Sequence, residues 1–260
     1  MFKNSVIIIV VKVTLSDGSV VNGWHLLPAG ETATRSALLT DPELREQYFD
    51  AALRQADSIV LSLHGNAGNR GTKDRVAEDR MLASQASVGN CHVLAIDYRG
   101  FGESTGWPSH WPSEESTAED TGALWSWLES LLLSGQQQRE EKSGKDEKVT
   151  GTPGDSLDDT CASAAQTSVS SDTEGSRSSC SARGDTTSKL PKVFIYGHSL
   201  GCAISTQLAS HLSSRRGRVE DQLEPAGLIL VSPFTSAPEV ARDYPYTAFL
   251  RLVPYATDMM

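Results

Sequence analysis

Short apolar runs alternate with amphipathic stretches along the chain up to residue 133 and again after residue 190. Two β-branched runs on either side of a Ser-Asp-Gly turn predict an amino-terminal β-hairpin. The later apolar runs are solid rather than alternating, which predicts strands that are buried on both faces. In chain order, strands are expected at 5–15, 20–27, 58–63, 92–96, 191–196 and 227–231, and helices at 43–55, 74–86, 116–133 and 200–214. Strands that alternate with helices indicate an α/β fold, with a mostly parallel sheet and helices on both of its faces.

Residues 134–189 interrupt this pattern. The segment is rich in serine and threonine, has no aromatic residue, and has Val149, Leu157 and Val169 as its bulky aliphatic residues. Burial of so little apolar surface does not offset the entropy that a chain loses when it becomes ordered. We therefore expect a disordered insertion within one domain, whose two parts are residues 1–133 and 190–260. A phosphorylated regulatory loop is the alternative interpretation, although serine-rich composition alone indicates no mechanism.

The composition narrows the classes of partner. The chain has 33 Asp and Glu residues against 23 Lys and Arg residues, for a net charge of −10, whereas contact with nucleic-acid phosphates requires a basic surface. Its 4 cysteines lack metal-ligand spacing and are too sparse for a disulfide framework, which favours a reducing compartment. We expect no nucleic-acid partner, no metal and no organic cofactor. The longest early apolar run, at 6–11, is also far too short to span a membrane.

One motif contains a candidate nucleophile. Residues 197–201 read Gly-His-Ser-Leu-Gly and lie between an apolar strand and a helix. In a nucleophile elbow, a sharp strand-to-helix turn exposes a serine hydroxyl, and small residues two positions before and after the serine allow the turn. The pattern assigns the nucleophile to Ser199 and the elbow glycines to Gly197 and Gly201. A glycine-rich turn without chemistry is the alternative interpretation of these residues.

A serine that attacks an ester also needs backbone N–H groups directed at the developing oxyanion. These donors usually come from the residue after the serine and from the loop after an earlier strand. Residues 64–68, His-Gly-Asn-Ala-Gly, follow the strand expected at 58–63. We expect the two donors to be the N–H groups of Leu200 and Asn66.

These motifs together resemble the α/β-hydrolase superfamily. They read LHGNAG at 63–68, DYRGFGES at 97–104, GHSLG at 197–201 and SPFT at 232–235, in this order. More closely, the chain resembles the lysophosphatidylserine and monoacylglycerol lipase branch, the twelfth group of α/β-hydrolase-domain proteins. The resemblance implies hydrolysis of acyl esters of monoacylglycerols or lysophospholipids, through Ser199 and an acyl-enzyme. It also implies that 97–104 forms a packed structural turn and that 244–255 begins a cap over the acyl chain. An ordinary core-facing helix is the alternative interpretation of 244–255.

The sequence does not assign the base and the acid of a catalytic triad. In this superfamily the chain order is serine, acid and then histidine, and His211 is the only histidine after Ser199. On the expected helix, His211 would lie roughly 18 Å along the axis from Ser199, beyond the reach of proton transfer. The chain is therefore expected to end before the last strands of the fold and to show little or no turnover by itself.

Two alternatives to a lipase remain open. Serine aminopeptidases share the fold and the motifs, and a fold does not decide the substrate. A non-catalytic α/β-hydrolase scaffold that binds a lipid or a protein would account for the unassigned base and acid. The related lipases are anchored in the endoplasmic reticulum membrane by an amino-terminal helix, so the resemblance implies association with a membrane surface. A cytoplasmic location is the alternative, because the chain shows no such helix.

Overall fold

The computed structural model describes the chain in separate stretches. The described residues are 8–28, 42–66, 68–84, 89–106, 112–146, 190–216 and 223–236. The segment expected to begin a cap, 244–255, lies outside them, as does most of the serine-rich segment, 147–189. The chain divides into two units, one formed by Met1–Gln136 and Leu190–Met260 and the other by Gln137–Lys189. The sheet and the candidate site belong to the first unit.

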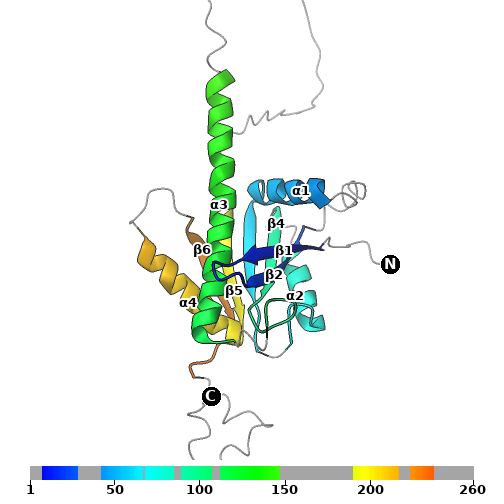
Figure 1. Ribbon diagram of the computed structural model, residues 1–260, viewed down its shortest axis with the longest axis vertical. Coiled ribbons are helices and arrows are strands. Elements are labelled where there is room, and N and C mark those ends of the chain that lie inside the picture. The colour runs from blue at the N-terminus through cyan, green and yellow to red at the C-terminus, as the bar shows by residue number, and fades with distance from the viewer. Residues whose placement is uncertain are drawn as a thin grey trace, which may run out of the picture. The chain divides into compact units, whose positions relative to one another are not determined.

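The strands of the first unit form one six-stranded sheet in the order β1-β2-β4-β3-β5-β6 (Figure 1). The first two strands make an antiparallel hairpin, β2 pairs antiparallel with β4, and the remaining neighbours are parallel. The predicted α/β fold is confirmed. In chain order the elements are β1 (Ile8–Thr14), β2 (Val20–Leu26), α1 (Pro42–Arg54), β3 (Ser58–Leu63), α2 (Lys73–Ala83), β4 (Cys91–Asp97), α3 (Glu114–Asp146), β5 (Lys192–His198), α4 (Leu200–Arg215) and β6 (Pro225–Val231).

Helices cover both faces of the sheet. On one face, α3 and α4 bury Leu128 and Leu208 against strand residues such as Leu61 and Ile195. On the other face, α2 packs Ala83 among residues of β3, β4 and β5. Because every residue of β3 and of β4 is buried, these two strands form the centre of the core, as their solid apolar sequences predict.

Helix α3 is longer than the sequence predicts. Its apolar residues face the core as far as Leu132, but the helix continues to Asp146 instead of ending at residue 133. The expectation of disorder from residue 134 is therefore wrong for residues 134–146. These residues are mostly Gln, Arg, Glu and Lys, which have high intrinsic helix propensity and need no burial to extend an existing helix.

Strand β6 also differs from the prediction, because it is not buried on both faces. Leu228, Ile229 and Leu230 are 40, 41 and 38% exposed. In the described part of the chain, β6 pairs only with β5 and lies at one edge of the sheet. An apolar edge strand of this kind presents both side chains and backbone groups that can pair with a further strand.

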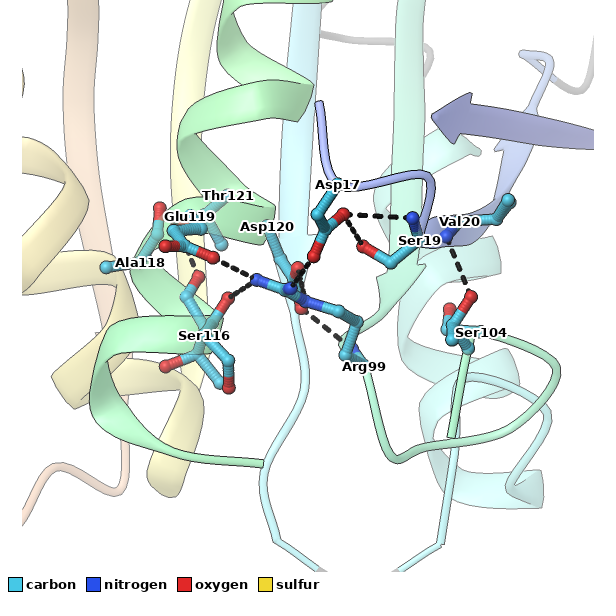
Figure 2. Close-up of polar contacts among 12 residues, drawn as sticks. Asp17, Ser19, Val20, Arg99, Ser104, Ser116, Ala118, Glu119, Asp120 and Thr121 are labelled. Atoms are coloured by element: carbon cyan, nitrogen blue, oxygen red, sulfur yellow. Dashed lines mark hydrogen bonds and ion pairs between the residues drawn. The ribbon is translucent and has the colours of Figure 1, made fainter. Parts of the chain in front are cut away.

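A buried arginine joins the hairpin, the end of β4 and the start of α3 (Figure 2). The backbone N–H of Arg99 donates to Asp120 Oδ2 at 2.7 Å, and its Nε donates to Asp120 Oδ1 at 2.6 Å. Its Nη1 reaches Asp17 Oδ2 at 2.9 Å, in the turn between β1 and β2, and its Nη2 reaches Glu119. Because Arg99 and Asp120 are 3% and 0% exposed, water screens this pair little, and the pair fixes the loop that follows β4.

Candidate active site

Ser199 lies in a sharp turn between β5 and α4. Its backbone angles are φ 54° and ψ −117°, in a region that residues other than glycine rarely adopt and that costs of order 1–3 kcal/mol. Its N–H donates to the carbonyl of Val231 in β6 at 2.9 Å, and its own carbonyl accepts from the N–H of Cys202 at 2.8 Å. The strained backbone of Ser199 is therefore held from both sides, in the conformation that a nucleophile elbow requires.

The two glycines that flank this turn lie where no side chain fits. A Cβ atom on Gly197 would fall 2.4 Å from Ser205 Oγ and 2.5 Å from the carbonyl oxygen of Gly201. A Cβ atom on Gly201 would fall 2.0 Å from the carbonyl oxygen of Leu63, at the end of β3. Both contacts are far shorter than van der Waals separation, so the close crossing of β5, α4 and β3 requires glycine at both positions.

The loop after β3 passes directly beside the serine. A Cβ atom on Gly65 would lie 3.0 Å from Ser199 Cβ and 3.6 Å from Ser199 Oγ. Asn66 follows on the exposed side of this loop, and Leu200 is the first residue of α4, where backbone N–H groups have no acceptor within the helix. The fold therefore places Leu200 directly after the serine, and Gly65, the residue before Asn66, against it.

Asp97, the last residue of β4, and Tyr98, which follows it, hold both ends of this loop. The carboxylate of Asp97 accepts from the N–H of Arg70 at 2.6 Å, pairs with the guanidinium of Arg70, and lies 3.1 Å from His64 Nε2. The hydroxyl of Tyr98 donates to the carbonyl of His64 at 3.0 Å. Burial raises the pKa of Asp97, but its contacts with His64 and Arg70 outweigh burial and hold the pKa below its usual value. Asp97 thus has a structural role, as an ionised anchor for the loop.

A second acidic group lies beneath the loop, on the face that α2 covers. Asp79 is 3% exposed and accepts from Ser62 Oγ at 2.7 Å. Burial raises its pKa to about 6. Glu78 accepts from the hydroxyl of Tyr196, and a cavity of about 10 Å³, the size of one water molecule, lies among these side chains. Sequence patterns did not identify this cluster, although Asp79 lies four residues before the buried Ala83 on the same face of α2.

The described residues do not supply a base for Ser199. In these stretches the serine hydroxyl has no histidine or carboxylate hydrogen-bond partner, and His211 is exposed near the far end of α4. Across the same stretches, no group of His, Cys, Asp and Glu side chains converges as a metal site. None of the described helices combines the length and the apolar character needed to cross a membrane.

Comparison with known proteins places the chain in a family. The family described as "Alpha/beta hydrolase family" matches residues 59–258, a range that contains the loop after β3, the turn after β4 and the Ser199 elbow.

Two curated relatives belong to the branch that the sequence motifs indicate. The chain is 28% identical over 232 residues to lysophosphatidylserine lipase ABHD12 of Gallus gallus, covering 89% of this chain and 41% of the relative. It is 24% identical over 239 residues to protein ABHD12B of Homo sapiens, covering 91% of this chain and 44% of the relative. The chain therefore spans less than half the length of these relatives.

A solved esterase structure from Pyrococcus furiosus aligns with a TM-score of 0.47 at 15% identity, over 98% of this chain and 60% of that one. On the match over residues 59–258, the chain belongs to the α/β-hydrolase family.

Proposed function

We propose that this protein hydrolyses acyl esters of monoacylglycerols or lysophospholipids, with Ser199 as the nucleophile. The observation that carries the proposal is the backbone of Ser199, held at φ 54° between two glycines that no other residue could replace. Strain of this kind persists only where the surrounding contacts impose it, and it clusters at active sites.

The reaction follows from the groups around the elbow. Ser199 Oγ attacks the ester carbonyl carbon, and its proton passes to a base outside the described residues. The N–H groups of Asn66 and Leu200 donate to the oxyanion that forms on the carbonyl oxygen. Collapse of this intermediate releases the alcohol, which takes up a proton, and leaves an acyl-enzyme. Water then attacks the acyl-enzyme and releases the fatty acid.

The substrate class rests on the relatives and on one surface feature. The relatives include proteins named lysophosphatidylserine lipase. Beside α4 the surface forms an open hollow of about 410 Å³, lined by both apolar and polar side chains, that is large enough for part of an acyl chain. Its lining residues are Cys202, Ala203, Thr206, Gln207, Ser210, Leu230, Pro233 and Phe234.

Turnover measurements test this proposal. The protein, expressed from its complete reading frame, is expected to release fatty acid from a monoacylglycerol or a lysophospholipid, and Ser199→Ala should abolish the release. An aminoacyl amide serves as the comparison substrate, and faster cleavage of the amide would indicate an aminopeptidase instead. Binding of the lipid without cleavage, by a folded protein, would indicate a non-catalytic scaffold and would contradict the proposal.

A further inference from the structure

We propose that Arg75, on the first turn of α2, is a positioning residue that aims the N–H of Asn66 at the reaction centre. This inference rests on the proposed function of Ser199. Arg75 donates to three carbonyl groups of the loop after β3. Its Nη2 reaches the carbonyl oxygens of Gly65 at 3.0 Å and Asn66 at 2.9 Å, and its Nη1 reaches that of Asn69 at 2.9 Å.

The contact with Gly65 determines where the next N–H points. In a trans peptide, the carbonyl of one residue and the N–H of the following residue point in opposite directions. The carbonyl of Gly65 is held by Arg75 Nη2 and by His64 Nδ1, the latter at 2.7 Å. The N–H of Asn66 is therefore directed away from α2. A Cβ atom on Gly65 would lie 3.0 Å from Ser199 Cβ, so this N–H belongs to a peptide that borders the serine.

The loop needs such a restraint because its own sequence supplies little rigidity. It contains Gly65 and Gly68, and glycine rotates between backbone conformations more freely than any other residue. Gly68 adopts φ +77°. A donor contributes to oxyanion stabilisation only when it is oriented before the charge forms, since reorientation during the reaction costs free energy.

Arginine suits this task better than lysine. Its guanidinium is a planar fork with several N–H donors at fixed spacing, whereas the ammonium of lysine is a single point on a flexible chain. Glu78 and Asp79 lie on the same helix, one turn further on, and line the same small cavity as Arg75. Their negative charge compensates the partly buried guanidinium and keeps it close to the loop.

Kinetics of three variants test this role. Arg75→Met should lower kcat for an ester substrate by about 10- to 100-fold, less than the 10²–10³ of a deleted oxyanion donor, with KM nearly unchanged. Arg75→Lys keeps the charge without the fork and should recover only part of that loss. Arg80→Met, at an exposed arginine in the last turn of α2, is the matched control and should retain the activity of the wild type.

A thionoester substrate, in which sulfur replaces the carbonyl oxygen, distinguishes a loss of oxyanion stabilisation from a general loss of activity. The sulfur of a thionoester accepts hydrogen bonds weakly, so its hydrolysis gains little from the two N–H donors. The preference for the oxygen ester over the thionoester should therefore fall in Arg75→Met by about the same factor as kcat. An unchanged preference, or full activity in Arg75→Lys, would assign the effect to stability or to charge and would overturn the positioning role.

Backbone ¹⁵N relaxation tests the same claim without any substrate. In the wild type the N–H of Asn66 should show an order parameter of about 0.85, typical of rigid backbone, and in Arg75→Met it should fall below about 0.6. An unchanged order parameter would overturn the inference. If the wild type hydrolyses no ester, the proposed function of Ser199 fails, and the relaxation result alone then decides whether Arg75 orients this peptide.

Discussion

The buried carboxyl of Asp79 should make the stability of this protein depend on pH. Burial, reinforced by the charge of Glu78, outweighs the hydrogen bond from Ser62 and the charge of Arg75, and the pKa rises from 3.8 to about 6. Below pH 3.8 this carboxyl is protonated in both the folded and the unfolded chain. As the pH rises through 6, the folded chain must ionise a group that the unfolded chain ionised already near pH 4. The stability that Asp79 contributes at low pH is therefore lost between about pH 4 and pH 6.

The size of this effect follows from the shift. Each unit of pKa corresponds to 1.36 kcal/mol, so a shift of about two units corresponds to about 3 kcal/mol. Asp79→Asn keeps the volume of the side chain and an oxygen that accepts from Ser62, but it carries no charge at any pH. The free energy of unfolding of this variant, relative to the wild type, should rise by about 2.5 kcal/mol between pH 4 and pH 8, because a small part of the loss has already occurred at pH 4.

Urea denaturation at pH 4, 5, 6, 7 and 8 measures this difference. Asp74→Asn is the matched control, because Asp74 is an exposed carboxylate on the first turn of the same helix. Its relative free energy of unfolding should change by less than about 1 kcal/mol over the same range. If the two substitutions give the same pH dependence, Asp79 is not a buried ionisable group with a raised pKa, and the reasoning is refuted.

Three further changes test the packing at the Ser199 turn and the buried Arg99 network. Gly201→Ala should destabilise the fold by about 1–3 kcal/mol or more and should abolish reaction of the serine, whereas Gly122→Ala, at an open position of α3, should stabilise by about 1 kcal/mol in thermal denaturation. Arg99→Met should lower the free energy of unfolding by about 3–5 kcal/mol, because it leaves the carboxylate of Asp120 buried without an opposite charge. A second substitution, Asp120→Asn, should recover part of that loss in urea titrations. Ser199→Gly should remove the hydroxyl and relieve the positive φ, so calorimetry should show a more stable but inactive protein; a lower melting temperature would contradict the strain at Ser199.

The sequence predicted the central strands well because their signal is local. Residues 58–63 form a solid apolar run between polar residues, and β3 has the same bounds. The helices were predicted less well at their ends. The last apolar residue of α3 is Leu133. Residues 134–146 nevertheless continue the helix, because helix propensity does not require burial.

The residues of the candidate site likewise include some that the sequence predicts and others that it does not. Gly197, Ser199 and Gly201 form a short pattern whose strand and helix are adjacent in the sequence, so the sharp turn between β5 and α4 could be predicted. The role of Ser199 as a nucleophile stays a prediction. Arg75 and Asp79 act through contacts with residues that are distant in the sequence or belong to other elements. An arginine and an aspartate on a mostly polar helix look like solvated residues until the sheet brings Gly65 and Ser62 beside them.

The central claim is that Ser199 is an activated nucleophile, and covalent labelling tests it most directly. A fluorophosphonate reacts with a serine hydroxyl only where a base and oxyanion donors activate it. The protein, expressed from its complete reading frame and treated with this probe, should carry one adduct that peptide mass spectrometry maps to Ser199. The adduct should be lost in Ser199→Ala. A folded protein that remains unlabelled, or that is labelled at another residue, would contradict the account.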